Sequence, residues 1–274
     1  MSHRMTGILL VIPAIIIVFL FFIIPLMATL TGAFSVSGSW SMGNFEKAFN
    51  LYWRDIIFTL IIVSTSTILI ALFSIAIGGY LTLGRNPLAV NILRWLYRWP
   101  LFVPFIVVGQ ILRTFLAKNG LMNSALIELD LLSPINAMSF LDWRGIVIAF
   151  VWKQAPFVTL MTAGAMASVN RQMIEAANLF GASRFRILIE ILLPQVRQTI
   201  FVGLILSFVT MMSVLSVPQM INAQSPTMMT VNMAFRINAY GDYGVANALG
   251  TISLLMTGFL AWIYLRQTIR DNKR

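Results

Sequence analysis

The chain has 274 residues, of which 59% are hydrophobic and 10% are charged. No folded surface in water could hide that much apolar side chain, so a water-soluble globular domain is excluded and a multi-pass membrane protein is expected. Cysteine is absent and there is one histidine, His3, which excludes disulfides, thiolate metal sites and chemistry based on paired histidines.

The net charge is +10, and the 19 basic residues are scattered among apolar stretches. Scattered basic residues of this kind are typical of topology determinants in a membrane protein. Binding to nucleic acid is therefore not expected.

Six apolar stretches have the length of membrane spans, given a hydrocarbon core of about 30 Å and a helix rise of about 1.5 Å per residue. In chain order they are residues 8–27, 56–83, 99–115, 145–165, 198–217 and 246–264. The first continues to Pro25, past the usual length of a signal peptide's apolar region, so we interpret it as a retained span. The third has Pro100 and Pro104 in its first turns, where proline is tolerated or kinks the helix. The expected fold is all-α, with six transmembrane helices in a single domain over residues 1–274.

The distribution of Lys and Arg predicts the orientation, because cytoplasmic loops carry the excess of these residues. With the first end inside, 12 basic residues lie in cytoplasmic segments and 5 lie in outside loops or at their borders. The first group is Arg4, Arg85, Arg94, Arg98, Arg171, Arg184, Arg186, Arg197, Arg266, Arg270, Lys273 and Arg274; the second is Lys47, Arg54, Lys118, Arg144 and Arg236. Both termini are therefore expected in the cytoplasm, together with the link at about 168–197.

The stretch from Glu175 to Pro194 within that link has the pattern of two short helices joined by a bend. Glu175 suits the positive end of a helix dipole, and Gly181 permits the left-handed conformation that stops a helix. Ser183 can cap a second helix, which Pro194 would end or kink. We expect a rigid elbow between two membrane spans.

The same stretch contains E-A-A, three residues, G, nine residues and I-x-L-P, a pattern that resembles the EAA loop of the membrane subunits of ATP-binding-cassette importers. In that family the short helix is a coupling helix that sits in a groove of the ATPase subunit. Asn178 and Phe180 differ from the charged residue and Leu of many relatives, which could tune the choice of ATPase. The resemblance implies ATPase-coupling roles for Glu175, Ala176, Ala177, Gly181, Ala182, Ser183 and Pro194.

Three further stretches, LAKNGLMNSAL at 116–126, VWKQAPF at 151–157 and SVPQMI at 216–221, look like the branch that imports polyamines, ferric iron, thiamine, opines and 2-aminoethylphosphonate. The resemblance implies a type I (MetI-like) permease in the bacterial inner membrane. Its implied partners are membrane lipid, two ATPase subunits, a second permease that is expected to be a different chain, and an external solute-binding protein. A cofactor in this chain is not expected, since ATP and Mg²⁺ would be bound by the ATPase.

Five polar or helix-breaking residues fall inside the expected third and fourth spans, where a charge is costly unless it has a partner, water or the protein interior to face. The functional hypothesis is that they line the translocation pathway or its gate. The structural alternative, given equal weight, is that Lys153 holds two helices together or reaches a polar loop. The five residues are Gln110, Arg113, Lys153, Gln154 and Pro156.

The sequence offers no catalytic or metal site of its own: it has no Gly-rich phosphate loop, no paired His and no intramembrane acid pair. The 16 methionines are more typical of adaptable packing than of metal capture. The chain is therefore expected to be a transport subunit that depends on a partner for energy. The alternative is an ATP-independent secondary transporter or channel, for which inverted repeats or broken helices would be typical.

Overall fold

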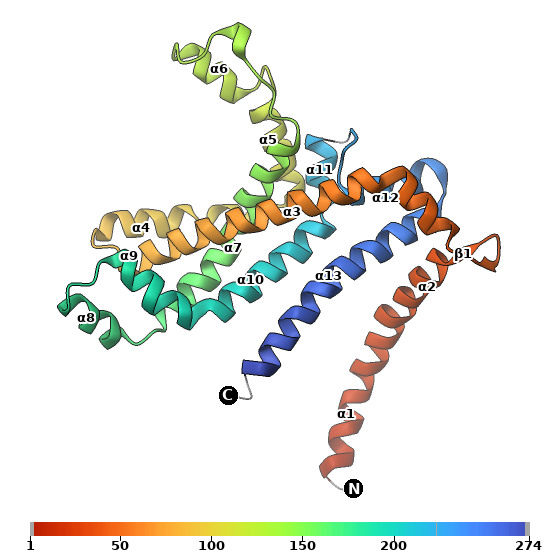
Figure 1. Cartoon of the computed structure of the whole chain (residues 1–274), viewed down its shortest axis with the longest axis horizontal. Coiled ribbons are helices and arrows are strands. Elements are labelled where there is room, and N and C mark those ends of the chain that lie inside the picture. The colour runs from red at the N-terminus through yellow and green to blue at the C-terminus, as the bar shows by residue number, and fades with distance from the viewer. Residues whose placement is uncertain (1–2, 223, 272–274) are drawn as a thin grey trace. The chain divides into compact units, whose positions relative to one another are not determined.

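The computed structural model describes residues 3–222 and 224–271, and these residues form an almost entirely helical chain (Figure 1). They divide into two compact units. Unit 1 comprises Met1–Arg54 with Val231–Met256, and unit 2 comprises Asp55–Thr230 with Thr257–Arg274. Helices α3 (Gly43–Leu83), α12 (Met229–Tyr240) and α13 (Tyr243–Asp271) each contribute to both units.

Unit 1 begins with a nearly continuous helix made of α1 (His3–Val18), a π-helical turn (Phe19–Ile23) and α2 (Ile24–Ala33). A small antiparallel hairpin follows, in which β1 (Ser35–Val36) pairs with β2 (Ser39–Trp40). The buried Asn44 side chain at the start of α3 donates hydrogen bonds to the carbonyls of Ala33 and Ser35, at 3.1 and 2.9 Å. The bond to Ala33 satisfies a carbonyl at the end of α2 that the helix itself leaves without a partner, and the bond to Ser35 joins α3 to the hairpin.

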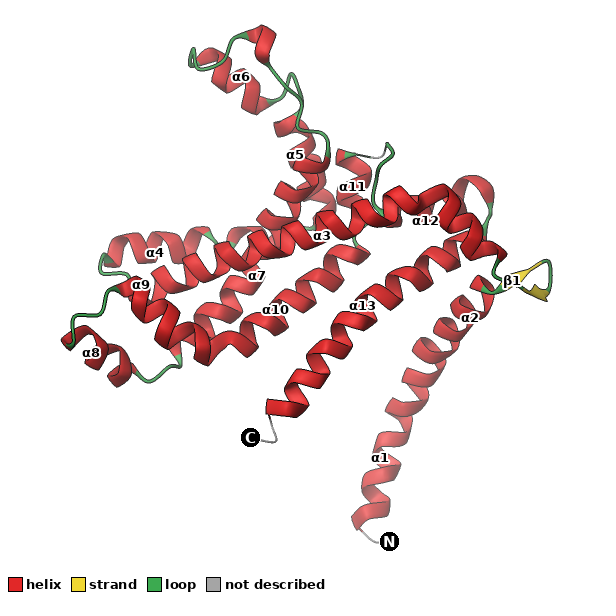
Figure 2. Ribbon diagram, in the orientation of Figure 1, coloured by secondary structure: helices red, strands yellow, loops and turns green. Residues whose placement is uncertain are grey.

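Unit 2 contains the remaining helices, which Figure 2 shows as red ribbons joined by green loops. They are α4 (Pro87–Leu96), a 3-10 turn (Trp99–Phe102), α5 (Phe105–Leu116), α6 (Leu121–Glu128), a 3-10 turn (Pro134–Asn136), α7 (Trp143–Ala167), α8 (Arg171–Leu179), α9 (Arg184–Ile187), a π-helical turn (Leu188–Leu192), α10 (Leu193–Ser213) and α11 (Ser216–Ile221). Helices α7 and α10 pack against each other along their lengths. One core cluster includes Met166 of α7 with Leu192, Val196 and Ile200.

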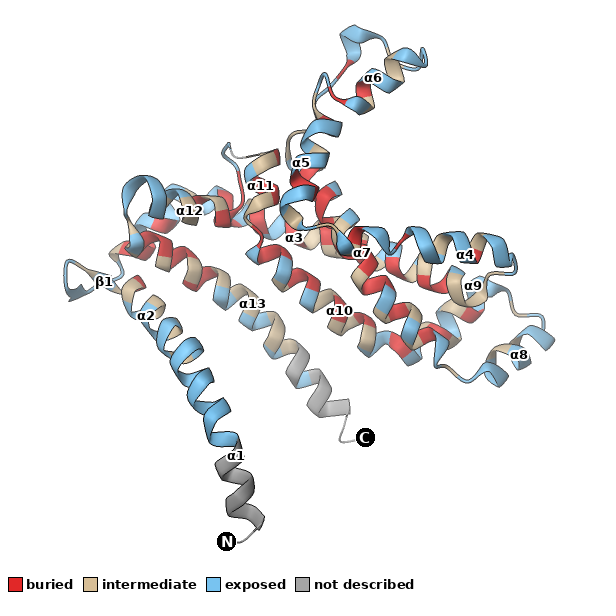
Figure 3. Cartoon of the chain, turned by 180° about the vertical axis from the view of Figure 1, so that it is seen from behind, coloured by how far each residue is buried: buried red, intermediate tan, exposed pale blue. Residues whose placement is uncertain are grey.

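The apolar side chains are placed as expected for a protein surrounded by lipid. Large apolar residues are exposed from Val11 onwards in α1 and in α2, as the pale blue ribbon in Figure 3 shows, and several more are exposed in α3. Within the described residues, five helices are long and apolar enough to cross a membrane, and a bent pair, Pro87–Phe102 with Phe105–Glu128, makes a sixth span if it is counted as one. The expected all-α membrane fold is therefore confirmed, and the bent pair brings the number of candidate spans to the expected six.

Three boundaries differ from the sequence prediction. The helix of the second span begins at Gly43 rather than Ile56, and that of the fifth begins at Arg184 rather than Gln198. In the third, the chain turns by 107° between Phe102 and Phe105, and Pro104 caps α5 in an extended conformation. The two prolines therefore break the third span, because proline cannot donate the backbone hydrogen bond that a continuous helix needs.

Candidate coupling site

The first arm of the elbow is α8, a nine-residue helix that begins at Arg171. The Asn170 side chain caps it by accepting a hydrogen bond from the Gln172 amide at 2.9 Å. Glu175 therefore lies in the second turn, where its carboxylate is 3.7 Å from the Arg171 guanidinium. The expectation that Glu175 stabilises the positive end of the helix is wrong, because the helix starts four residues earlier.

The bend at Gly181 has the geometry of a Schellman motif. Gly181 has a φ of +77°, and its amide donates to the Asn178 carbonyl at 3.0 Å. The Ala182 amide donates to the Ala177 carbonyl, also at 3.0 Å. These two bonds close the end of α8 and require a left-handed residue, for which glycine has no steric cost. The predicted helix stop at Gly181 is confirmed.

The second arm is continuous with a membrane-spanning helix. The Ser183 hydroxyl accepts a hydrogen bond from the Arg186 amide at 3.2 Å, which confirms the predicted cap. From Arg184 the helix runs through the π-helical turn into α10 and reaches Ser213. Pro194 therefore does not end the second helix; it is the second residue of α10, just after the π-helical turn, and helices commonly kink at both features without stopping.

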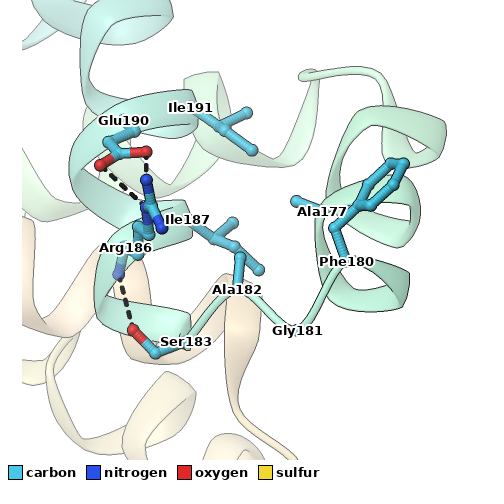
Figure 4. Close-up of a pocket in the computed structure, with 9 residues that line it drawn as sticks. All are labelled: Ala177, Phe180, Gly181, Ala182, Ser183, Arg186, Ile187, Glu190 and Ile191. Atoms are coloured by element: carbon cyan, nitrogen blue, oxygen red, sulfur yellow. Dashed lines mark hydrogen bonds and ion pairs between the residues drawn. The ribbon is translucent and has the colours of Figure 1, made fainter.

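A cleft of about 530 Å³ opens between the two arms. Figure 4 shows Ala177 and Phe180 on the α8 side, Arg186 and Glu190 on the other side, and Gly181, Ala182 and Ser183 in the connecting turn. The Arg186 Nε donates to both Glu190 carboxylate oxygens, at 3.0 and 2.9 Å. At the tip, Leu179 and Phe180 are 89% and 92% exposed.

Four of the residues expected to couple line this cleft: Ala177, Gly181, Ala182 and Ser183. Glu175 instead lines a different cavity, and neither Ala176 nor Pro194 lines either one. Arg186 and Glu190 are not among the site residues expected from the sequence, although opposite charges four residues apart on a helix signal such a pair.

The residues expected to line a pathway are placed in two groups by the structure. Lys153 of α7 donates from Nζ to the carbonyls of Pro100 and Leu101, at 2.8 and 3.0 Å, and its ammonium is 5.5 Å from the centre of the Phe105 ring. These contacts tie α7 to the broken part of the third span. Gln154 and Pro156 are buried in the same helix.

Arg113 of α5 makes the second tie, because its Nη1 donates to the Met220 carbonyl of α11 at 2.9 Å. Helices α5 and α11 pack against each other over this region. Gln110, also on α5, is exposed. Lys153 belongs to the motif VWKQAPF and Met220 belongs to the motif SVPQMI. Two of the three short motifs therefore take part in these hydrogen bonds between segments.

The third short motif, LAKNGLMNSAL, also connects two segments of the chain. The buried Asn123 side chain donates to the carbonyls of Lys118 and Met138, at 2.9 and 2.8 Å. It thereby joins the α5–α6 turn to the chain that leads into α7. The partners of Asn123 cannot be predicted from its sequence neighbours, so the motif indicates only a family resemblance at the level of sequence.

Comparison with known proteins identifies the family. Residues 74–268 match the family described as the binding-protein-dependent transport system inner membrane component. The trehalose/maltose transport system permease protein MalF of Thermococcus litoralis is 26% identical, over 95% of this chain and 92% of the relative. The sulfoquinovosyl glycerol transport system permease protein SmoG of Agrobacterium fabrum is also 26% identical, over 97% and 91%.

Comparison with solved structures finds the same fold in ABC transporters. One chain in the crystal structure of a bacterial alginate ABC transporter, in complex with a periplasmic protein that holds an alginate pentasaccharide, superposes with a TM-score of 0.81. The alignment covers 98% of this chain and 96% of that chain, at 21% identity. Because the family match covers well over half of the sequence, this chain belongs to the binding-protein-dependent transport system inner membrane components, the permease subunits of ATP-binding-cassette importers.

Proposed function

We propose that the elbow, residues 168–197, docks against a partner ATPase in the cytoplasm, and that this chain forms half of the translocation pathway. The observation that carries the proposal is the exposure of Leu179 and Phe180, at 89% and 92%, beside a turn whose backbone is fixed by its own hydrogen bonds. Large apolar side chains outside the membrane-spanning helices suit a protein interface. Burying each one would contribute about 1.5–3 kcal/mol.

The continuity of the second arm with α10 supplies a mechanical reason for this assignment. A displacement of α8 by the ATPase would pass through Gly181 and Ser183 into a single helix that crosses the membrane. Helix α3 packs tightly against the same segment at Gly79. A Cβ atom at this position would lie only 2.9 Å from Leu188 Cδ1. Packed helices with two discrete arrangements can convert such a displacement into alternating access. The partner ATPase would bind ATP and Mg²⁺ and supply the energy.

The complete assembly is proposed to hold two ATPase subunits, a second permease that is a different chain, and an external solute-binding protein. In the membrane, both termini and the elbow are placed in the cytoplasm, on the basis of the Lys and Arg distribution. The elbow and the hairpin at Ser35–Trp40 should then lie on opposite sides.

The proposed substrate is a carbohydrate or a carbohydrate-containing solute. Support comes from the relatives aligned over most of their length, whose names specify trehalose/maltose and sulfoquinovosyl glycerol. The expected branch of polyamine, iron, thiamine or aminophosphonate importers is not confirmed by these relatives. Polyamine uptake stays a second candidate on the basis of the three short motifs, and uptake assays with a labelled disaccharide and labelled spermidine would separate the two.

The decisive variant for coupling is Gly181→Leu. The site has open space, with nothing within 4 Å of a Cβ, but its φ of +77° would cost a leucine about 1–2 kcal/mol. The elbow should therefore change conformation, and ATP-dependent uptake in membrane vesicles should fall while ATP hydrolysis continues. Full uptake by Gly181→Leu would overturn the coupling role, and vanadate-insensitive uptake by the wild type would favour the ATP-independent alternative.

A matched control exists at Gly38, in the β1–β2 turn. Its φ is +83°, and nothing lies within 4 Å of a Cβ there. Gly38→Leu thus imposes a similar backbone cost away from the elbow, and it should leave the ratio of transport to hydrolysis unchanged. Equal uncoupling by both variants would mean that strain alone explains the loss.

The orientation can be tested with single cysteines, since the wild type has none. Ala176→Cys in α8 and Ser39→Cys in the hairpin are both at exposed positions. A membrane-impermeant maleimide added to intact cells should label Ser39→Cys alone, and inverted vesicles should give the opposite result. Labelling of Ala176→Cys in intact cells would reverse the proposed topology.

A further inference from the structure

A second cavity, of about 1030 Å³, lies beside the elbow and is lined by the end of α3, by α4, by the end of α7 and by α8 and α9. Figure 1 shows α4, α8 and α9 gathered at one end of unit 2. Its lining contains one acid, Glu175. It contains five arginines: Arg85, Arg94, Arg98, Arg171 and Arg184.

Most of this positive charge is not neutralised by the protein. Within the part of the chain that the structure describes, Arg171 is the one member of the five with a carboxylate in ion-pair range, that of Glu175 at 3.7 Å. Arg98 donates from Nε to the Tyr97 hydroxyl at 3.2 Å, a neutral partner. Several guanidinium groups around one cavity repel one another, and an anion would convert the repulsion into charge-assisted hydrogen bonds.

The residues of α4 and of the turn after it indicate that this cavity lies near the membrane surface. Three large apolar side chains at helical spacing on α4, Leu88, Ile92 and Trp95, are exposed, while Val90 is buried on another face of the helix; Trp99, in the turn that follows, is also exposed. The Trp95 and Trp99 rings lie 5.0 Å apart in an edge-on arrangement. Trp95 and Trp99 flank Arg98 in the sequence, and tryptophans beside arginines are typical of the headgroup region at the end of a membrane span.

The remaining lining of the cavity is mixed: it includes the polar Thr82 and Asn178 and an apolar part with Leu81, Leu83 and Leu160. A ligand with an anionic head and an apolar tail would thus satisfy both parts of the lining. A small soluble anion would satisfy the arginines alone, and an acidic segment of a protein would leave the leucines without an apolar partner.

We propose that this cavity binds the phosphate of an anionic phospholipid headgroup, with Arg94 of α4 and Arg184 of α9 as its principal ligands and the leucines contacting the acyl chains. The evidence for this site is the lining of the cavity and the character of α4, so the proposal does not depend on the coupling role of the elbow. It would, however, place a lipid against Glu175 and Arg184, and the amount of anionic lipid would then affect the position of the elbow.

The test compares two double variants that remove the same charge. Arg94→Gln/Arg184→Gln acts in the cavity, and Arg54→Gln/Arg197→Gln removes two exposed arginines outside it. The full chain, purified in a neutral detergent, would be titrated with short-chain phosphatidylglycerol and followed by native mass spectrometry. We expect the cavity variant to lose about tenfold in affinity, equivalent to roughly 1.4 kcal/mol, and the control to change by less than about twofold. Equal losses in both variants would reduce the effect to general surface charge and overturn the proposal.

Two additions distinguish other sources of the anion. Inorganic phosphate or glycerol phosphate should compete weakly, because neither has an acyl chain, and displacement of the lipid at equal concentrations would identify a free-anion site instead. Loss of lipid binding when the partner ATPase is added would identify a protein contact. If the double variant does not fold, the single change Arg94→Gln at an exposed position should still weaken lipid binding relative to Arg54→Gln.

Discussion

The elbow and the intramembrane junction use polar groups in opposite ways. We define the junction as α5, α7, α11 and the turn Trp99–Phe102. In the elbow, the bonds that fix the backbone join residues two to five positions apart, and the tip side chains stay exposed. In the junction, Lys153 and Arg113 bind carbonyls that lie 53 and 107 residues away. The elbow is thus formed locally and its tip is free to contact a partner, whereas the cations of the junction contact carbonyls on distant parts of the chain.

Lys153→Met should have the largest effect on stability and would test this contrast most strongly. The change removes two charge-assisted hydrogen bonds and leaves the Pro100 and Leu101 carbonyls without their ammonium partner. We expect a loss of about 2–3 kcal/mol in the free energy of unfolding. Chemical unfolding in mixed micelles would measure it, with Lys118→Met, at an exposed loop position, as the control.

Transport measurements on the same variant separate the two hypotheses for Lys153. If the residue only joins helices, uptake should fall in proportion to the folded fraction, and assembly with the ATPase should persist in the protein that folds. A variant with unchanged stability and lost uptake would instead assign Lys153 to the pathway.

Arg113→Met should cost less, about 1.5 kcal/mol, which is the lower end of the range for a charged donor, because this side chain is exposed. The lost interaction is the bond from Nη1 to the Met220 carbonyl. The same unfolding experiment applies, and Arg113→Lys, which keeps the charge, serves as the comparison. Equal stability of Arg113→Met and the wild type would show that the tie to α11 is not needed for the fold.

The elbow could be predicted from the sequence because its determinants are local. Gly181 and Ser183 act on amides and carbonyls within a few residues, so their roles follow from residue type and spacing alone. The two errors, at Glu175 and Pro194, both concern where a helix begins or ends. Asn170 caps α8, so that this helix begins earlier in the chain than Glu175. The second helix continues through Pro194, and it packs against α3 at Gly79.

The junction could be predicted only in part. A lysine inside an apolar span signals a required partner, but the sequence alone does not specify which carbonyl 53 residues away will accept its protons. The break in the third span had a visible cause in Pro100 and Pro104. The direction of the 107° turn depends on tertiary packing, which hydropathy does not describe.

Ser183→Ala tests how much a single helix cap contributes to the local structure of the elbow. The hydroxyl satisfies the Arg186 amide at 3.2 Å, and loss of such a cap typically costs about 1 kcal/mol. Because α9 is continuous with α10, we expect local fraying at Arg184–Ile187 rather than global unfolding. Hydrogen exchange of these amides should be faster than in the wild type, while the amides of α10 should be unchanged. Faster exchange throughout α10 would show that the elbow and the span unfold as one unit.

Glu190→Gln should have the smallest effect and tests whether the cleft is held by its ion pair. The Arg186–Glu190 pair is well exposed, at 66% and 58% of the two side chains, and pairs at this spacing contribute about 0.3–0.5 kcal/mol. Stability should therefore be nearly unchanged. If the cleft receives the ATPase, however, the freed Arg186 would alter the charge that the partner meets, and the affinity of the complex should change more than the stability does. An affinity that stays the same, measured by titration of the purified ATPase against both proteins, would place the contact on the apolar tip at Leu179 and Phe180 rather than on the charged wall of the cleft.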